Sequence, residues 1–260
     1  MKKKNVLVTG SEGFIGNTLC KYFKKKKIKF RKIKIKEINK KHKEITHLLH
    51  LQFFISKDGK KNFQQKNVAV IKKILKKCVK ENIKLIFFSS SGVNLGNNDY
   101  TNSKKKCENE IIKFNKKYGL KFIILRIFNV YSFNLKSRGV IPDLIKRINK
   151  NNKITLKFPD NTRDFIYISD VLKFVTKSLN LNQSTYLQVG TGKATKIYSL
   201  AKKIKSLFSS NCKIIRSKQK KSKSNSFSKA DLNLNENFFS WRPLIDLDRG
   251  IKLIKKQYQN

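Results

Sequence analysis

Near its start the chain reads NVLVTGSEGFIG over residues 5–16, and this stretch decides the fold. The apolar run at residues 6–8 predicts a short buried strand. Apolar residues recur at helical spacing from Ile15 to Phe23, which predicts a helix immediately after the glycines. A strand, a glycine-rich turn and a helix in this order are typical of the first unit of a nucleotide-binding α/β sheet.

The three glycines of this turn follow the spacing Gly-x-x-Gly-x-x-Gly. Gly10 permits a tight turn, Gly13 lets the backbone approach a pyrophosphate, and Gly16 allows the helix to pack closely on the strand. Free N–H groups and the dipole at the start of the helix favour an anion at the same place. The residues expected to bind a dinucleotide here are Gly10, Gly13, Phe14, Ile15 and Gly16.

The first half of the chain continues this alternation of strand and helix patterns, which indicates a parallel sheet with helices on both faces. The predicted strands are residues 6–8, 28–35, 48–51, 85–88 and 122–125, and beyond them lie helical patterns at 140–148 and 199–208. We therefore expect an α/β fold, a Rossmann doubly wound parallel sheet with a smaller C-terminal substrate-binding lobe. Residues 1–130 would form the dinucleotide-binding domain, with roughly 164–180 packing back on it, and residues 131–260 would form mainly the lobe.

The composition indicates a folded protein with an unusual charge. Of its 260 residues, 39% are hydrophobic and 11% aromatic, which is too many for a disordered chain. The formal net charge of +45 invites a nucleic-acid or polyanion-binding interpretation. Only eight of the 61 basic residues are Arg, the side chain that specific phosphate and base recognition favours. Because biased codon usage also produces a dispersed Lys excess, we expect no specific nucleic-acid partner.

Cysteine usage and hydropathy argue against several other classes. The four cysteines are far apart and lack the spacing of a zinc site or a disulfide framework, and the three histidines form no convincing metal set. The first residues lack the apolar stretch of a signal peptide, and no run reaches the ~18 apolar residues of a membrane span. We therefore expect a cytoplasmic protein without membrane association and without a bound metal.

The end of the second predicted strand bears on the identity of the dinucleotide. An acidic residue ~20 positions after the glycines commonly holds the adenosine ribose. In this chain the neighbourhood reads FRKIK at residues 30–34, with Arg31, Lys32 and Lys34 in place of a carboxylate. A basic residue such as Arg31 suits the 2′-phosphate of NADP, although basic residues also arise by chance in so Lys-rich a chain. NAD and NADP therefore both stay open.

A tyrosine, a lysine and a serine form the candidate catalytic group. Tyr100 and Lys104 open a helical segment, and a spacing of four puts the phenol and the ammonium on one helix face. A nearby ammonium, together with a nicotinamide cation, stabilises phenolate and lowers the pKa of tyrosine from about 10, so that Tyr100 can exchange a hydroxyl proton. Ser91 ends the stretch FFSSS at the carboxyl end of a predicted strand, where α/β sheets place their chemistry.

These motifs, in this order, resemble those of the extended short-chain dehydrogenase/reductases, specifically the NAD-dependent epimerase/dehydratase branch, whose members include UDP-glucose 4-epimerases and act on nucleotide sugars. The resemblance implies that Tyr100 is the base and Lys104 the cofactor-binding lysine. It also implies that Ser91 is the catalytic serine and binds the substrate, because its hydroxyl shares the substrate oxygen with Tyr100. It further implies that the cofactor is NAD or NADP. The other residues that it places at the cofactor are His50, Leu51 and Asn67.

The resemblance continues into the second half of the chain. The segment LRIFNVY at residues 125–131 is similar to the start of the sugar-nucleotide site, so Phe128 and Asn129 are expected to contact the substrate. In the segment TRDFIYISDV at residues 162–171, Arg163 is expected to contact the nucleotide diphosphate, as a guanidinium fork suits. Lys220 and Lys221 lie roughly where relatives place a phosphate-binding Arg.

The implied reaction is a reversible hydride transfer, in which Tyr100 exchanges the proton of a sugar hydroxyl while nicotinamide exchanges the hydride of the same carbon. The 4,6-dehydratases of the family resemble this chain least, because Gly92 and Val93 stand where they carry an acidic pair. A nucleotide-sugar 4-epimerase is therefore expected, with an NADP-dependent 4-keto-sugar reductase as the alternative among enzymes. A polyanion- or RNA-associated Rossmann protein is the alternative outside them. The expected partners are a nucleoside-diphosphate sugar and a second copy of the chain, in a pathway to cell-surface polysaccharide.

Overall fold

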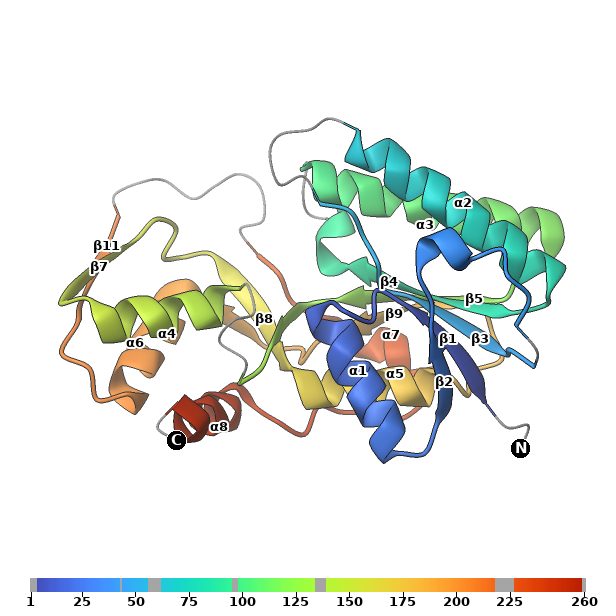
Figure 1. The fold of residues 1–260 in the computed structure, drawn as a ribbon. Helices are drawn as coiled ribbons and strands as arrows, with labels where there is room; N and C mark the ends of the chain where they lie inside the picture. The colour runs from blue at the N-terminus through green and yellow to red at the C-terminus, as the bar shows by residue number, and fades with distance from the viewer. Residues whose placement is uncertain are drawn as a thin grey trace. The chain divides into compact units, whose positions relative to one another are not determined.

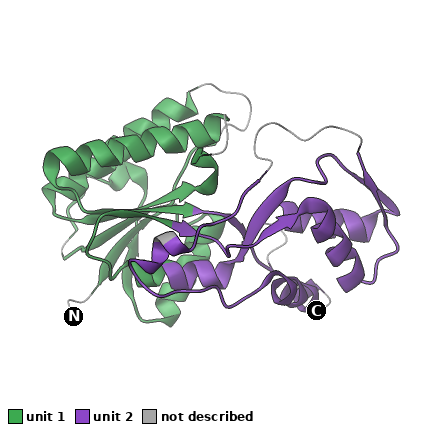
Figure 2. Ribbon diagram, turned by 180° about the vertical axis from the view of Figure 1, so that it is seen from behind, with its two compact units in different colours: residues 1–126, 175–187 green, residues 127–174, 188–260 purple. Residues whose placement is uncertain are grey.

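The structure is a computed structural model, and it describes residues 4–42, 44–55, 62–94, 98–133, 139–217 and 227–258. The chain divides into two compact units (Figure 2). Unit 1 contains residues 1–126 and 175–187, and unit 2 contains residues 127–174 and 188–260.

Unit 1 is built on a six-stranded sheet with the order β2-β1-β3-β4-β5-β9. Its strands are β1 (Asn5–Thr9), β2 (Lys29–Lys32), β3 (His47–His50), β4 (Lys84–Ser90), β5 (Phe122–Ile127) and β9 (Thr185–Val189). β1 pairs in parallel with β2 on one side and with β3 on the other. The chain therefore changes direction across the sheet at β1, which creates a topological switch point between β1 and β3.

Helices cover both faces of this sheet. α2 (Phe63–Lys80) and α3 (Asp99–Tyr118) lie side by side on one face, and α1 (Phe14–Lys25) lies on the other (Figure 1). The apolar stripe of α2 and the inward side chains of the strands form one core, which includes Leu7, Leu48, Ile71, Leu85 and Ile124. This core fixes the strand ends from which the candidate site projects.

The second strand is shorter than its alternating pattern predicted. β2 ends at Lys32, and the chain continues through the 3₁₀ turn η1 (Ile35–Glu37). The last contact with β1 is the bond from the Ile33 N–H to the Val8 carbonyl, at 3.0 Å. The alternation continues past the strand because Ile33 and Ile38 turn back into the core.

Unit 2 combines two small sheets with short helices. One sheet has the order β10-β8-β6 and the other pairs β11 with β7. Its strands are β6 (Asn129–Tyr131), β7 (Lys153–Leu156), β8 (Thr162–Tyr167), β10 (Ala194–Lys196) and β11 (Lys213–Arg216). Its helices are α4 (Val140–Lys150), α6 (Ile197–Leu207), α7 (Asn233–Glu236) and α8 (Leu247–Tyr258), while α5 (Ile168–Ser178) begins in unit 2 and ends in unit 1.

The division of the chain differs in detail from the expected one. The first long segment of unit 1 ends at residue 126, and the segment that returns to it is 175–187 rather than 164–180. β8 pairs with β6 in parallel and with β10 in antiparallel orientation, so the residues around 164 belong to unit 2.

Candidate active site

The glycine-rich turn has the conformation that its spacing predicts. Gly10 follows β1 with φ +71°, and a Cβ atom there would collide with the backbone of Gln52. A Cβ atom on Gly16 would collide with the carbonyl of Gly10, so the helix can approach the strand only with glycine at this position. Gly13 is the N-cap of α1, and a Cβ atom built on it would meet only the Gly10 carbonyl oxygen, at 3.5 Å. No side chain caps α1, which leaves the positive end of the helix dipole at the turn.

A cavity of about 750 Å³ opens beside this turn. Its lining comes from the glycine turn, the end of β2 with η1, and the segment after β3: Gly10, Ser11, Glu12, Gly13, Lys32, Ile33, Lys34, Ile35, Lys36, Glu37, Leu51, Gln52 and Phe53. These elements meet at the carboxyl ends of β1, β2 and β3, at the switch point of the sheet. The glycine cradle and the size of the cavity fit a dinucleotide.

The structure places the predicted cofactor residues in different environments. Gly10, Gly13 and Leu51 line the cavity, and Phe14 and Ile15 begin the helix beside it. Arg31 does not line it, although its neighbours Lys32 and Lys34 do. The lining begins at Lys32, the last residue of β2, and continues through residues 33–37, whereas Arg31 lies inside the strand.

His50 is a buried link between two strands. Its Nδ1 lies 2.7 Å from the Thr9 hydroxyl, and its ring stacks on Phe87 with centroids 5.9 Å apart. Burial lowers the pKa of His50 to about 3, so its imidazole is neutral in the folded protein. His50 is not among the described residues that line the cavity. Its bond to Thr9 instead joins β3 to β1.

Asn67, predicted beside the cofactor, anchors the segment that follows β3. Its side-chain oxygen accepts from the Phe54 N–H at 2.9 Å, and its amide donates to the Phe54 carbonyl at 3.0 Å and to the Ser103 hydroxyl at 3.3 Å. Through these bonds one side chain of α2 holds the backbone of Phe54 in place and ties it to α3.

Tyr100 and Lys104 lie one turn apart at the start of α3, as their spacing predicted. The helix is capped by the Asn98 side chain, which accepts from the Thr101 N–H at 2.9 Å. The Lys104 ammonium is buried, with 3% of the residue exposed, and donates to the Phe88 carbonyl at 2.5 Å. Burial lowers the pKa of Lys104 to about 7.

Phe53 covers both of these side chains. The Lys104 ammonium lies 3.7 Å from the centre of the Phe53 ring, and the Tyr100 ring meets the same ring edge to face at 5.5 Å. Because Phe53 also lines the glycine-turn cavity, this one aromatic side chain separates the cavity from Tyr100 and Lys104. Sequence reasoning did not identify Phe53, since no local pattern distinguishes it from Phe54.

The pKa of Tyr100 is shifted in the direction opposite to the one expected. Burial of the phenol raises its pKa, and a side-chain hydrogen bond with Ser90 opposes this increase. The Lys104 ammonium is 5.9 Å from the Tyr100 ring centre and is directed at the Phe88 carbonyl and the Phe53 ring. The expected activation of the phenol by Lys104 therefore requires Lys104 to turn away from these partners.

The three consecutive serines at the end of β4 have different surroundings. The Ser89 hydroxyl donates to the buried Glu108 carboxylate at 2.5 Å. Ser90 bonds Tyr100 and also accepts from the Gly92 N–H at 3.2 Å. Ser91 begins the 3₁₀ turn η2 (Ser91–Asn94) and is half-buried. The hydroxyl next to the phenol thus belongs to Ser90, because β4 ends there and the alternation of its side chains stops.

Apart from Ser91, which follows β4 in unit 1, the predicted substrate residues lie in unit 2. Phe128 is buried and donates its N–H to the Val189 carbonyl, while the Asn129 amide donates to the Asp164 carbonyl at 2.9 Å. Arg163 is half-buried on β8 and donates to the Thr162 carbonyl at 2.7 Å, and burial lowers its pKa. Lys220 and Lys221 lie outside the described residues.

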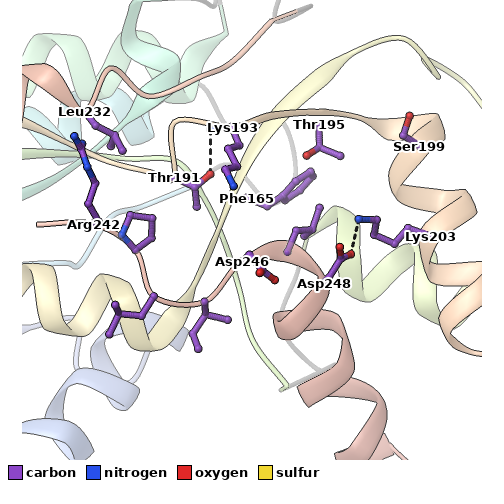
Figure 3. A pocket seen from close by; sticks show the side chains of 14 residues that line it. Phe165, Thr191, Lys193, Thr195, Ser199, Lys203, Leu232, Arg242, Asp246 and Asp248 are labelled. Carbon is purple, nitrogen blue, oxygen red and sulfur yellow. Dashed lines mark hydrogen bonds and ion pairs between the residues drawn. The ribbon is translucent and has the colours of Figure 1, made fainter.

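Unit 2 also contains a cavity of about 620 Å³ that no sequence pattern indicated (Figure 3). Residues of β8, α6, α8 and the segment 242–248 surround it, with Phe165 in the middle of the view and Lys203 paired with Asp248. Phe128, Asn129 and Arg163 are not among its lining residues.

Asp164 supports one wall of this cavity. Its buried carboxylate accepts from the Thr191 N–H and hydroxyl, the Gly192 N–H and the Ala230 N–H, at 2.6 to 3.1 Å. A single side chain therefore joins the loop at 190–192 to the segment at 230.

Within the described ranges, His, Cys, Asp and Glu side chains form no group of three placed to hold a metal ion. No helix in these ranges combines the length and apolar character needed to cross a membrane.

Known proteins with similar sequences act on nucleotide sugars, as their names state. The chain is 30% identical over 196 residues to a protein provisionally named UDP-glucose 4-epimerase from Methanocaldococcus jannaschii, covering 68% of this chain and 63% of that one. It is 22% identical over 163 residues to UDP-glucuronic acid decarboxylase 6 of Arabidopsis thaliana, covering 62% and 47%. The chain thus spans less than two thirds of the length of these relatives.

Solved structures share the fold. UDP-glucose 4-epimerase of Thermotoga maritima with UDP-glucose matches with a TM-score of 0.84 at 20% identity, over 98% of both chains. The dTDP-glucose 4,6-dehydratase of Bacillus anthracis with NAD matches with a TM-score of 0.82 at 16% identity, over 99% of this chain and 98% of that one.

Residues 6–190 match the sequence profile of the NAD-dependent epimerase/dehydratase family. The match runs from the glycine-rich turn through the helix that carries Tyr100 and Lys104 and on into unit 2. Because it covers most of the chain and both cofactor-side motifs, this protein belongs to the NAD-dependent epimerase/dehydratase family.

Proposed function

We propose that the protein catalyses hydride transfer on a nucleoside-diphosphate sugar with a nicotinamide dinucleotide, and that it is a nucleotide-sugar 4-epimerase. The observation that carries the proposal is the position of Phe53, which lines the glycine-turn cavity and contacts both Tyr100 and Lys104. A proton-exchanging phenol is thus one side chain away from a cavity that fits the dinucleotide.

In this reaction Tyr100 takes the proton of a sugar hydroxyl at its phenolate oxygen and later returns it. A nicotinamide dinucleotide held by Gly10, Gly13 and the start of α1 would supply the hydride chemistry at the same carbon, which the chain itself lacks. Lys104, once displaced from Phe53, places its ammonium near the phenol and lowers the pKa of Tyr100.

The two serines at the end of β4 have separate roles in the proposal. Ser90 orients the phenol, since it already bonds Tyr100. Ser91 stands at the carboxyl end of the strand and binds the substrate oxygen. Replacing Ser91 with Ala should lower kcat/KM, whereas replacing Ser90 with Ala should also shift the pH profile, because it removes a hydrogen bond that lowers the pKa of Tyr100.

In unit 2 we assign the substrate contacts to Phe128, Asn129 and Arg163. Arg163 is the ligand proposed for the diphosphate, because a guanidinium binds two phosphate oxygens at once. Arg163→Lys keeps the charge and loses this fork, so it should raise KM for the nucleotide sugar.

A second reaction is supported by a separate observation. Lys32 and Lys34 line the cofactor cavity, and basic residues there suit NADP, which reductases exchange at each turnover. An NADP-dependent reductase of a nucleotide 4-keto sugar is therefore the alternative. It requires net consumption of NADPH, whereas a 4-epimerase interconverts two sugars without net change in the dinucleotide.

We also propose that the protein forms a homodimer through α2 and α3, which pack side by side. Sedimentation equilibrium at physiological salt tests this, and a single species with the mass of one chain at micromolar concentration would contradict it.

The test of the proposed reaction is an assay against UDP-, dTDP-, GDP- and CDP-sugars with chromatographic detection of products. Tyr100→Phe should abolish turnover without unfolding the protein. Tyr118→Phe removes a phenol from the other end of the same helix, where the side chain is 49% exposed, and serves as the matched control. Full activity in Tyr100→Phe would remove this residue from the mechanism.

A further inference from the structure

We propose that the cofactor cavity of unit 1 binds the 2′-phosphate of an adenosine ribose, with Lys34 and Lys32 as its ligands, so that the chain prefers NADP(H) to NAD(H). This inference rests on the proposed function to the extent that the cavity holds a nicotinamide dinucleotide. It goes further because it specifies NADP(H) as the preferred dinucleotide and assigns that preference to Lys34 and Lys32 in place of Arg31.

The register of β1 and β2 places Lys34 at the ribose position. Val8 pairs with Lys32 in the parallel ladder, so the second residue after each lies at the same level: Gly10 after β1 and Lys34 after β2. In Rossmann sheets the residue that follows the second strand beside the first glycine faces the adenosine ribose. A carboxylate there accepts from the 2′-hydroxyl, whereas a cation there binds a 2′-phosphate.

The charges around this position favour a phosphate. Lys32, Lys34 and Lys36 all line the cavity and are exposed, so their ammonium groups can reach a ligand. Glu37 is the nearest carboxylate along the chain, and it is bound to the Lys40 ammonium at 3.0 Å. A free carboxylate for the 2′-hydroxyl of NAD is therefore absent between residues 30 and 37, all of which the structure describes.

Glu12 is the other carboxylate of the lining, and it lies within the glycine turn. That turn is where the pyrophosphate is expected, at the start of α1, and not at the end of β2. Glu12 is therefore not the acidic partner of the ribose.

Arg31 lies within β2, one residue before Lys32, where the lining of the cavity begins. It pairs with Leu7 in the ladder and is absent from the lining. Its charge acts on His42, whose pKa burial and the charges of Lys77 and Arg31 lower. The structure thus separates Arg31 from Lys34, although the sequence placed both near the adenosine ribose.

The experiment measures binding of NADP⁺ and NAD⁺ to the purified full chain by calorimetry at physiological ionic strength. The high net charge makes two fragment ligands necessary, 2′,5′-ADP and 3′,5′-ADP, which carry equal charge. A built site distinguishes the two isomers, whereas general attraction to a basic surface does not. We expect NADP⁺ to bind about tenfold more tightly than NAD⁺, and 2′,5′-ADP more tightly than 3′,5′-ADP, as one charge-assisted contact provides.

Four substitutions locate the contact. Lys34→Gln should remove most of the preference for NADP⁺, and Arg31→Gln should leave it within about twofold, since Lys34 lines the cavity and Arg31 does not. Lys29→Gln removes one exposed charge from the same strand outside the cavity and is the matched control. Lys34→Asp should reverse the preference by offering a carboxylate to the 2′-hydroxyl.

The outcomes separate this inference from the proposed function. Equal binding of the two dinucleotides, equal binding of the two ADP isomers, or loss of the preference in Arg31→Gln rather than Lys34→Gln would overturn the inference while sugar turnover could still be intact. Failure to bind either dinucleotide would overturn the inference and the proposed function together.

Discussion

Replacing Phe53 with Ala should uncover the Lys104 ammonium. In the folded protein the Phe53 ring lies 3.7 Å from this ammonium, and water is excluded from it. The substitution removes the ring and connects Lys104 to the glycine-turn cavity that Phe53 lines. Two effects then act on the pKa of Lys104 in opposite directions.

Burial is the larger effect. The difference between the ordinary pKa of 10.5 and the value of about 7 corresponds to about 5 kcal/mol that disfavours the charged form. A cation–π contact in a desolvated site favours the charged form by about 2 kcal/mol. Since hydration recovers more than the lost ring contact removes, the pKa of Lys104 should rise in Phe53→Ala, to about 9.

Competitive amine labelling followed by mass spectrometry measures this pKa for a single lysine. The protein is methylated over a range of pH, and fragmentation of the peptide that contains residues 104–106 separates Lys104 from the exposed Lys105 and Lys106, which act as internal references. Phe54→Ala is the matched control, because Phe54 is the next residue, is 37% exposed and has no described contact with Lys104. An unchanged or lower pKa of Lys104 in a folded Phe53→Ala protein would show that Phe53 is not the cover.

Three further predictions concern stability. Four hydrogen bonds converge on the Asp164 carboxylate, and Asp164→Asn replaces one of its acceptor oxygens with a donor, so it should lower the free energy of unfolding of unit 2 by about 2–4 kcal/mol. Urea unfolding followed by the fluorescence of the single tryptophan measures this change, and Asp143→Asn, at an exposed side chain, is the control. The pKa of His50 is about 3 in the folded protein and lies below its unfolded value, so the unfolded chain binds more protons below pH 6.5. The free energy of unfolding should therefore fall by up to about 1.4 kcal/mol for each pH unit below 6.5, and His50→Asn should reduce this slope. The Arg126 guanidinium lies 2.7 Å from the Glu108 carboxylate, and Glu108→Gln removes this charged partner, so it should destabilise unit 1 by about 3 kcal/mol. Equal urea midpoints for the variant and the unmodified protein would contradict a buried ion pair between Glu108 and Arg126.

The features that the sequence predicted well are local ones. The glycine turn follows from steric rules that act within a few residues, and the structure shows the positive φ and the close approach that those rules require at Gly10 and Gly16. Tyr100 and Lys104 share a helix face because the helical period alone places residues four apart together. The order of strands and helices follows in the same way from the apolar period.

The features that the sequence missed depend on where an element ends. β4 stops at Ser90, whose side chain bonds Tyr100, and the sequence did not predict this contact. β2 stops at Lys32, so Lys34 reaches the cavity and Arg31 does not. A shift of one residue at a strand end moves a side chain to the opposite face, and no pattern within the strand reports that position.

The sequence by itself determined that a glycine turn opens a parallel sheet and that a phenol and an ammonium share one helix, because both follow from backbone sterics and period within a single element. Only the tertiary structure decided which side chains surround them: Phe53 over Lys104, Asn67 holding Phe54, and Lys34 in the lining of the cavity. These contacts join residues from different elements, and their distances depend on how the strands and helices pack, which no single stretch of sequence encodes.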